Sequence, residues 1–156
     1  MSVEEVCNAQ VLEEYAEALR ALEPILYNLP AVIVAIDGRV GSGKTTLGRF
    51  LAWRFNVTLI ESDLFLHRNE GTFTYRNDHI TGILDSRMTS GSPVIVEGIV
   101  ALRLLAEVCH KHAFHIHLIG DESVGSSTTE QEWRKYDAAY RPIATANLIL
   151  KLPSLS

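Results

Sequence analysis

Short apolar runs alternate with longer helical segments along this 156-residue chain. The runs are rich in β-branched residues, which is typical of buried strands in a parallel sheet. We expect five strands, at 31–36, 57–60, 94–96, 114–119 and 148–150. Segments 4–22, 46–55 and 99–109 carry apolar residues at helical spacing, and 79–88 also reads as a helix. This alternation predicts a three-layer α/β fold in which helices cover both faces of a five-stranded parallel sheet.

Two prolines and one stretch rich in Ser, Thr and Gly predict where these elements end. Pro24 is expected to end or kink the first helix, and Pro30 to close its connection to the first strand. The stretch 120–129, rich in Ser, Thr and Gly, is expected to be mobile. A chain of this length has room for one domain, 1–156. We divide it into an N-terminal helix (1–30), a core (31–151) and a possible small lid (120–141).

Composition narrows the possible classes of protein. A hydrophobic content of 47% with 21% charged residues is that of an ordinary globular chain. The net charge of −5 and the lack of a basic stripe argue against nucleic acid as a partner. No apolar stretch reaches the length of a membrane span, and the acidic N-terminus lacks a signal-peptide pattern, so we expect a cytoplasmic protein. Cys7 and Cys109 are expected to be reduced and mostly buried.

The segment from Gly38 to Thr45 fits the Walker A pattern G-x-x-x-x-G-K-[ST] at every fixed position. Its glycines let backbone N–H groups converge on phosphate oxygens. Lys44 supplies a positive charge for the β- and γ-phosphates, and the Thr45 hydroxyl is suited to Mg²⁺. An expected strand precedes this nucleotide loop (residues 38–45) and an expected helix follows it. The predicted nucleotide-binding residues are Gly38, Arg39, Val40, Gly41, Ser42, Gly43, Lys44, Thr45 and Thr46.

Three carboxylates follow predicted strands, where ligands of open α/β sheets bind: Asp37, Asp63 and Glu97. Glu97 could hold Mg²⁺ directly or through water, or it could instead stabilise the start of the next helix. Asp63 could accept the proton of an attacking hydroxyl, or be a solvated turn residue.

Four motifs occur in the order seen in uridine kinase-like P-loop kinases, which the chain resembles over roughly residues 31–151. They are Gly38 to Thr46, Asp63-Leu64-Phe65, the segment from Tyr75 to His79, and Val96-Glu97-Gly98-Ile99. The resemblance implies that Asp63 is the general base and that Thr45 and Glu97 hold Mg²⁺. It also places the phosphate acceptor near Asp63, Phe65, Tyr75, Asp78 and His79.

The chain departs from that family at three places. Such kinases usually carry a lid with several arginines, whereas the cations available at 130–141 are Arg134, Lys135 and Arg141. The insert at 66–93 is also short, which suggests a small acceptor or a weakly covered site. Asn147 stands where a family aspartate often occurs.

A group of histidines lies at and before the fourth predicted strand. His115 and His117 alternate with apolar residues and therefore share one face of that strand. We interpret the group as helix-end and sheet-packing residues rather than metal ligands: His110, His112, His115 and His117. Trp53 is expected in the core, and Trp133 either in the core or in contact with the lid.

These observations predict a kinase that uses Mg²⁺ and ATP to phosphorylate a hydroxyl of a small metabolite, with a nucleoside as first choice. Lys44 would neutralise phosphate charge, Asp63 would accept the proton, and Arg134 would assist the transition state. The alternative is a nucleotide-binding switch with little transfer activity. No Asn-Lys-x-Asp motif occurs, which favours ATP over GTP.

Overall fold

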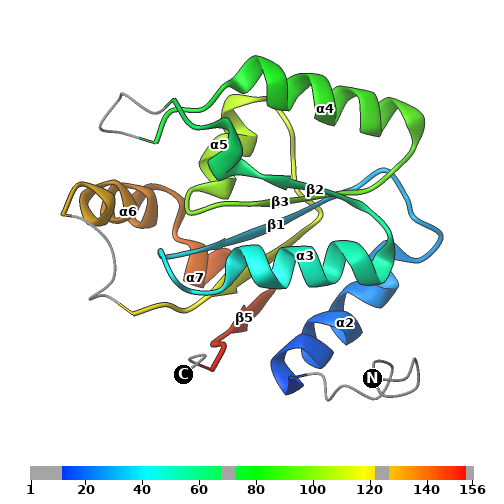
Figure 1. Ribbon diagram of the computed structural model, residues 1–156, viewed down its shortest axis with the longest axis horizontal. Coiled ribbons are helices and arrows are strands. Elements are labelled where there is room, and N and C mark those ends of the chain that lie inside the picture. The colour runs from blue at the N-terminus through cyan, green and yellow to red at the C-terminus, as the bar shows by residue number, and fades with distance from the viewer. Residues whose placement is uncertain (1–11, 68–72, 122–126, 154–156) are drawn as a thin grey trace, which may run out of the picture.

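A computed structural model describes residues 12–67, 73–121 and 127–153. Its centre is a five-stranded sheet of order β2-β3-β1-β4-β5, in which every neighbouring pair is parallel (Figure 1). The strands are β1 (Ile33–Gly38), β2 (Thr58–Glu61), β3 (Val94–Glu97), β4 (Phe114–Leu118) and β5 (Leu148–Leu150). The predicted parallel five-stranded sheet is therefore confirmed.

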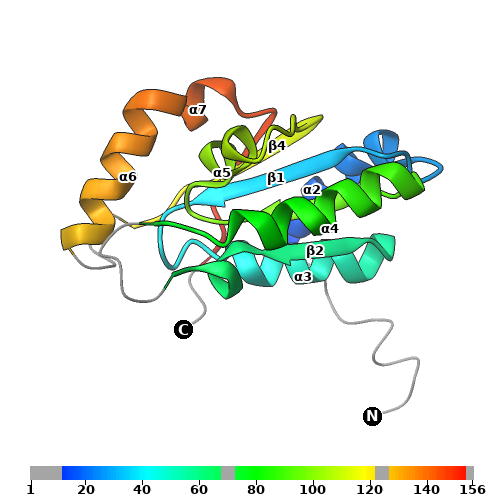
Figure 2. The same ribbon diagram turned by 90° about the horizontal axis from the view of Figure 1, so that it is seen from above.

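Helices cover both faces of this sheet. On one face lie α2 (Glu13–Leu26) and α3 (Lys44–Phe55). On the other lie α4 (Asn77–Ser90), α5 (Ala101–Glu107) and α6 (Ser127–Tyr140), as Figures 1 and 2 show. A short 3₁₀ helix, η1 (Ser62–Phe65), follows β2, and α7 (Pro142–Thr145) precedes β5.

Alternating side chains of β1 divide the core in two. Val34 and Ile36 pack with α2 and α3, whereas Ile33 and Ala35 pack with the helices of the opposite face. Because β1 is buried along its whole length, apolar residues occupy both faces until Asp37. Because β1 is the central strand, the nucleotide loop that follows it lies at the middle of the sheet's carboxyl edge.

Helix α2 corrects the expected effect of Pro24. The helix continues to Leu26 with Pro24 inside it, rather than ending at residue 22. Proline lacks an N–H and costs one hydrogen bond to the carbonyl four residues earlier, a loss that the final turn of a packed helix tolerates. Buried Leu22 and Leu26 hold that turn against the sheet. Residues 4–11 of the predicted helix lie outside the described residues.

Two expected core residues are instead exposed. Trp53 is 75% exposed, because it lies about 200° around α3 from buried Leu51 and therefore faces solvent. It contacts only the rim of the core, with its ring 6.2 Å from that of Phe50. Cys109 is a free, exposed thiol just after α5, where its φ of 58° turns the chain. Cys7 lies outside the described residues.

Helix α6 changes the interpretation of residues 120–141. Ser127 to Thr129, expected in a mobile stretch, form its first turn. Trp133 and Tyr136 are buried against the sheet, so Trp133 belongs to the core. Figure 2 shows α6 beside the carboxyl end of β1. Within the described ranges, no helix combines the length and apolar character needed to cross a bilayer.

Candidate active site

The nucleotide loop joins β1 to the first turn of α3. Gly43 is the N-cap residue of α3 and has a φ of 96°, a left-handed conformation that side chains disfavour. A Cβ at this position would also lie 2.7 Å from Leu152 Cδ1. The first turn of α3 contains no acidic residue, so its unpaired N–H groups present a positive end to an anion.

A cavity of about 300 Å³ lies at this helix terminus. Most of its lining comes from the predicted nucleotide-binding residues, and Asp63 of η1 and Ile99 complete it. The lining residues are Val40, Gly41, Gly43, Lys44, Thr45, Thr46, Asp63 and Ile99. The structure therefore brings Asp63 to the same cavity as Lys44 and Thr45.

The remaining loop residues support the loop from outside this cavity. Gly38 closes β1 so tightly that a Cβ would lie 2.5 Å from the Leu118 carbonyl oxygen. Ser42 is buried, and the Arg39 side chain contacts α6. Six of the nine predicted nucleotide-binding residues thus line the cavity, and Gly38, Arg39 and Ser42 do not.

Lys44 is held by the loop itself. Its buried ammonium Nζ donates a hydrogen bond of 2.9 Å to the backbone oxygen of Arg39. Burial lowers the pKa of Lys44, and the charges of Glu97 and Asp63 oppose that shift. Phosphate oxygens are stronger acceptors than a carbonyl, so an entering triphosphate would take over this ammonium.

Thr45, which lines the cavity, contacts Glu97 at the end of β3. The Thr45 hydroxyl donates a hydrogen bond of 3.1 Å to Glu97 Oε1. Burial raises the pKa of Glu97, while the charge of Lys44 and the bond from Thr45 lower it. These hydroxyl and carboxylate oxygens are the donor types that Mg²⁺ prefers, so the two residues fit the ion that such a loop requires.

A close approach of two chain segments places Asp63 beside Glu97. A Cβ at Gly98, just after β3, would lie 2.0 Å from the Ser62 hydroxyl oxygen, so only glycine fits there. Ser62 begins η1, and Glu61 lies level with Glu97 in the β2–β3 register. The glycine thereby allows the segment that carries Asp63 to pack against the end of β3.

The other predicted acceptor residues do not line this cavity. Phe65 packs against the core, and Tyr75 is buried, which raises the pKa of its phenol. The segments around them are joined by a hydrogen bond of 2.7 Å from the Arg76 N–H to the Phe65 carbonyl. Asp78 and His79 are exposed in the first turn of α4. A role for these four residues in acceptor binding stays a prediction.

The predicted lid cations are engaged elsewhere. Arg134 is exposed and donates to Glu130 Oε1 at 3.4 Å, and Lys135 donates to Glu132 at 3.3 Å. Neither lines the cavity. Contact between α6 and the loop instead comes from Arg39, which forms an ion pair with Glu130 and lies 5.2 Å from the Trp133 ring centroid.

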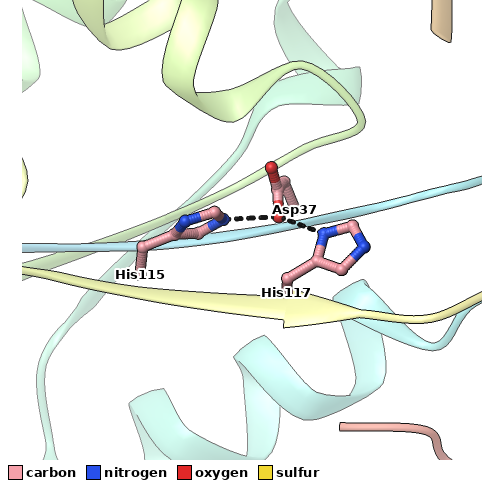
Figure 3. A group of neighbouring side chains, drawn as sticks. All are labelled: Asp37, His115 and His117. Atoms are coloured by element: carbon pink, nitrogen blue, oxygen red, sulfur yellow. Dashed lines mark hydrogen bonds and ion pairs between the residues drawn. The ribbon is translucent and has the colours of Figure 1, made fainter. Parts of the chain in front are cut away.

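Sequence reasoning also missed a buried cluster around Asp37. His115 Nε2 and His117 Nδ1 lie 2.6 and 2.8 Å from Asp37 Oδ1 (Figure 3). The Tyr136 hydroxyl donates to Oδ2. Burial alone would raise the pKa of Asp37, but the hydrogen bonds from His115 and His117 hold it below its usual value. The alternation of His115 and His117 along one strand was the available signal; their partner on β1 follows only from the register.

Solved structures show the same architecture. A possible uridine kinase from Bacillus stearothermophilus superposes with a TM-score of 0.61 and 13% identity, over 89% of this chain and 98% of that chain. This chain has the fold of the P-loop kinases. A gluconokinase from Sinorhizobium meliloti 1021 gives a TM-score of 0.51 and 16% identity, over 80% of this chain and 84% of that one. No protein-family model and no curated protein matches the chain. The P-loop kinase resemblance expected from the motifs is thus confirmed at the level of the fold.

Proposed function

We propose that the protein is an ATP-dependent kinase that transfers the γ-phosphoryl group to a hydroxyl of a small metabolite, with a nucleoside as the first candidate. The observation that carries this proposal is the shared cavity of Lys44, Thr45 and Asp63. A carboxylate in that cavity would be placed to accept the proton of an attacking hydroxyl. The similarity to a possible uridine kinase and a gluconokinase supports a small-molecule acceptor.

Each residue of the cavity would then have a defined task. The N–H groups of the loop and of α3 would hold the phosphates, and Lys44 would balance their charge. Thr45 and Glu97 would hold Mg²⁺, which supplies further neutralisation of the phosphate charge when bound. Asp63 would accept the proton of the acceptor hydroxyl as that oxygen attacks.

The acceptor side of the proposal rests on fewer contacts. Phe65, Tyr75, Asp78 and His79 would line the approach to Asp63 from η1 and the start of α4. Arg134 would need to leave Glu130 to assist the transferring group. Because the intervening segment 66–93 is short, we propose an acceptor no larger than a nucleoside or sugar.

The decisive experiment replaces the proposed base and measures ADP release with Mg²⁺-ATP and a panel of nucleosides, vitamins and sugars. Asp63→Asn should reduce acceptor-dependent turnover by about 10²-fold or more, because general base catalysis contributes on that scale. ATP affinity should change little, since Asn retains the size of the side chain. Asp137→Asn, on the exposed surface of α6, is the matched control and should behave as wild type. Full turnover by Asp63→Asn would refute the assigned role.

A second candidate is a nucleotide-binding switch without efficient transfer. It is favoured by the pairing of Arg134 with Glu130 and of Lys135 with Glu132, which leaves the cavity without either cation. A cationic group at the phosphoryl oxygens is worth about 10³-fold or more in rate. A switch would bind ATP in the same assay but show no acceptor-dependent ADP release with any member of the panel.

A further inference from the structure

A second constellation of ligand-type side chains lies next to the nucleotide loop but outside its cavity. His115 and His117 project from the same face of β4, and both point at Asp37 on the adjacent strand β1 (Figure 3). One nitrogen from each imidazole and one carboxylate oxygen lie within 4.8 Å of one another. Two nearby strands thus supply three convergent donors.

The surroundings of this cluster are buried and closely packed. The side chains of Asp37, His115 and His117 are at most 3% exposed. The Trp133 ring stacks on His117 with 5.9 Å between ring centroids. The Tyr136 hydroxyl donates to Asp37 Oδ2 and itself accepts a hydrogen bond of 3.2 Å from the Leu102 N–H. Such a second partner orients a carboxylate in the way that outer-shell groups orient metal ligands.

The buried charge of Asp37 needs compensation. Equivalent positions on this face of β1 and β3 hold apolar residues, Ile33, Ala35, Val94 and Val96. A buried carboxylate is costly unless a positive charge compensates it. Its three described hydrogen-bond partners are two imidazoles and a phenol, none of which carries a permanent charge. Lys44 interacts electrostatically with Asp37 but is not among these partners. A metal ion among the three donors would compensate the carboxylate at contact distance.

The donor set distinguishes this cluster from the Mg²⁺ site at Thr45 and Glu97. Two imidazole nitrogens and one carboxylate oxygen suit Zn²⁺ and its neighbours in the first transition row, whereas Mg²⁺ prefers oxygen alone. We propose that Asp37, His115 and His117 bind a divalent transition-metal ion of the Zn²⁺ class, with Tyr136 as the group that orients the carboxylate.

Metal binding would need only a small change of geometry. Ligands about 2.0–2.2 Å from a tetrahedral ion lie about 3.3–3.6 Å from one another, so the separations of 2.6 and 2.8 Å must lengthen by about 0.5–1 Å. Small rotations of the two imidazole rings supply this distance. Each ring would coordinate as a neutral ligand through the nitrogen that now faces Asp37, with its proton on the other nitrogen. The ion would join β4 to β1 directly before the nucleotide loop.

The test uses the full chain freed of metal with a chelator and then titrated with Co²⁺ or Zn²⁺ in excess Mg²⁺. Calorimetry should show one ion bound per chain, and Co²⁺ should give the visible absorption of a low-coordinate site. His117→Gln should weaken binding by at least about 100-fold, and Tyr136→Phe by about 10- to 100-fold, as for other outer-shell groups. His112→Ala, on an exposed residue of the same segment, is the matched control and should retain full affinity.

Two results would overturn the proposal: no stoichiometric binding in wild type, or binding that His112→Ala abolishes and His117→Gln retains. The first would show that hydrogen bonds and the charge of Lys44 stabilise the carboxylate without a metal ion. If His117→Gln fails to fold by circular dichroism, X-ray absorption of the Zn²⁺-loaded wild type decides, because only two imidazoles and one oxygen ligand fit the site. None of these readouts involves nucleotide. The metal-site proposal can therefore be refuted while the kinase proposal stands, and the kinase proposal can be refuted while the metal-site proposal stands.

Discussion

Tyr136 of α6 donates a hydrogen bond to Asp37, the last residue before the nucleotide loop, across 99 positions of the chain. Both groups are buried, so this bond ties the helix to the base of the loop in a water-free environment. The Arg39–Glu130 ion pair forms a second tie between the same two elements nearer the surface. Helix α6 is therefore part of the support of the loop, not a separate flap.

Tyr136→Phe tests the buried hydrogen bond between Tyr136 and Asp37. The substitution leaves Asp37 Oδ2 and the Leu102 N–H without their partner while it preserves the ring packing. We expect the free energy of unfolding in urea to fall by about 1–3 kcal/mol, the cost of unpaired buried polar groups. Tyr27→Phe, at a side chain that is 75% exposed, is the control and should change stability little. Equal stability of the two variants would contradict a stabilising role for this hydrogen bond.

Glu130→Gln tests the Arg39–Glu130 ion pair through the pH dependence of the stability that the pair contributes. The hydrogen bond from Arg39 holds the pKa of Glu130 below its ordinary value, so the pair stabilises the fold above that ordinary pKa. This stability is lost as pH falls through the lowered pKa, because the carboxyl then binds a proton. We expect the variant to unfold at lower urea concentration than wild type at pH 7, and the two midpoints to converge once the pH falls below the lowered pKa of Glu130. A difference that grows at acid pH would contradict this sign.

Gly43→Ala tests whether the loop conformation depends on glycine. A methyl group would strain the φ of 96° and approach Leu152 Cδ1 at 2.7 Å. We expect a loss of stability of about 1–3 kcal/mol and much weaker ATP binding. Gly82→Ala is the matched control, because a Cβ there meets nothing within 4 Å and the residue lies within α4. That control should gain about 0.5–1 kcal/mol. Unchanged thermal unfolding of Gly43→Ala would contradict the prediction.

The local sequence pattern predicted the sheet and the nucleotide loop well, because each strand and the loop depend on residues close together in the sequence. The runs around β1 and β3 are apolar on both faces, and the loop pattern fixes the places of Lys44 and Thr45. The rule that ligands bind at the carboxyl ends of strands was enough to bring Asp63 to the cavity.

Contacts between distant segments could not be predicted in this way. Whether Trp53 faces the core depends on how α3 rotates on the sheet, which helical spacing alone does not set. The Asp37 cluster needs both the β1–β4 register and the placement of α6, and neither is encoded near Asp37. The pairing of Arg39 with Glu130 could not be predicted for the same reason, because the two residues are 91 positions apart.

The most direct test of the proposed kinase site is a crystal structure with Mg²⁺ and a non-hydrolysable ATP analogue. We expect the triphosphate in the cavity at the start of α3, with Lys44 Nζ moved from the Arg39 carbonyl to the phosphates and Asp63 facing the γ-phosphate. A nucleotide bound elsewhere, or a γ-phosphate out of reach of Asp63, would contradict the account.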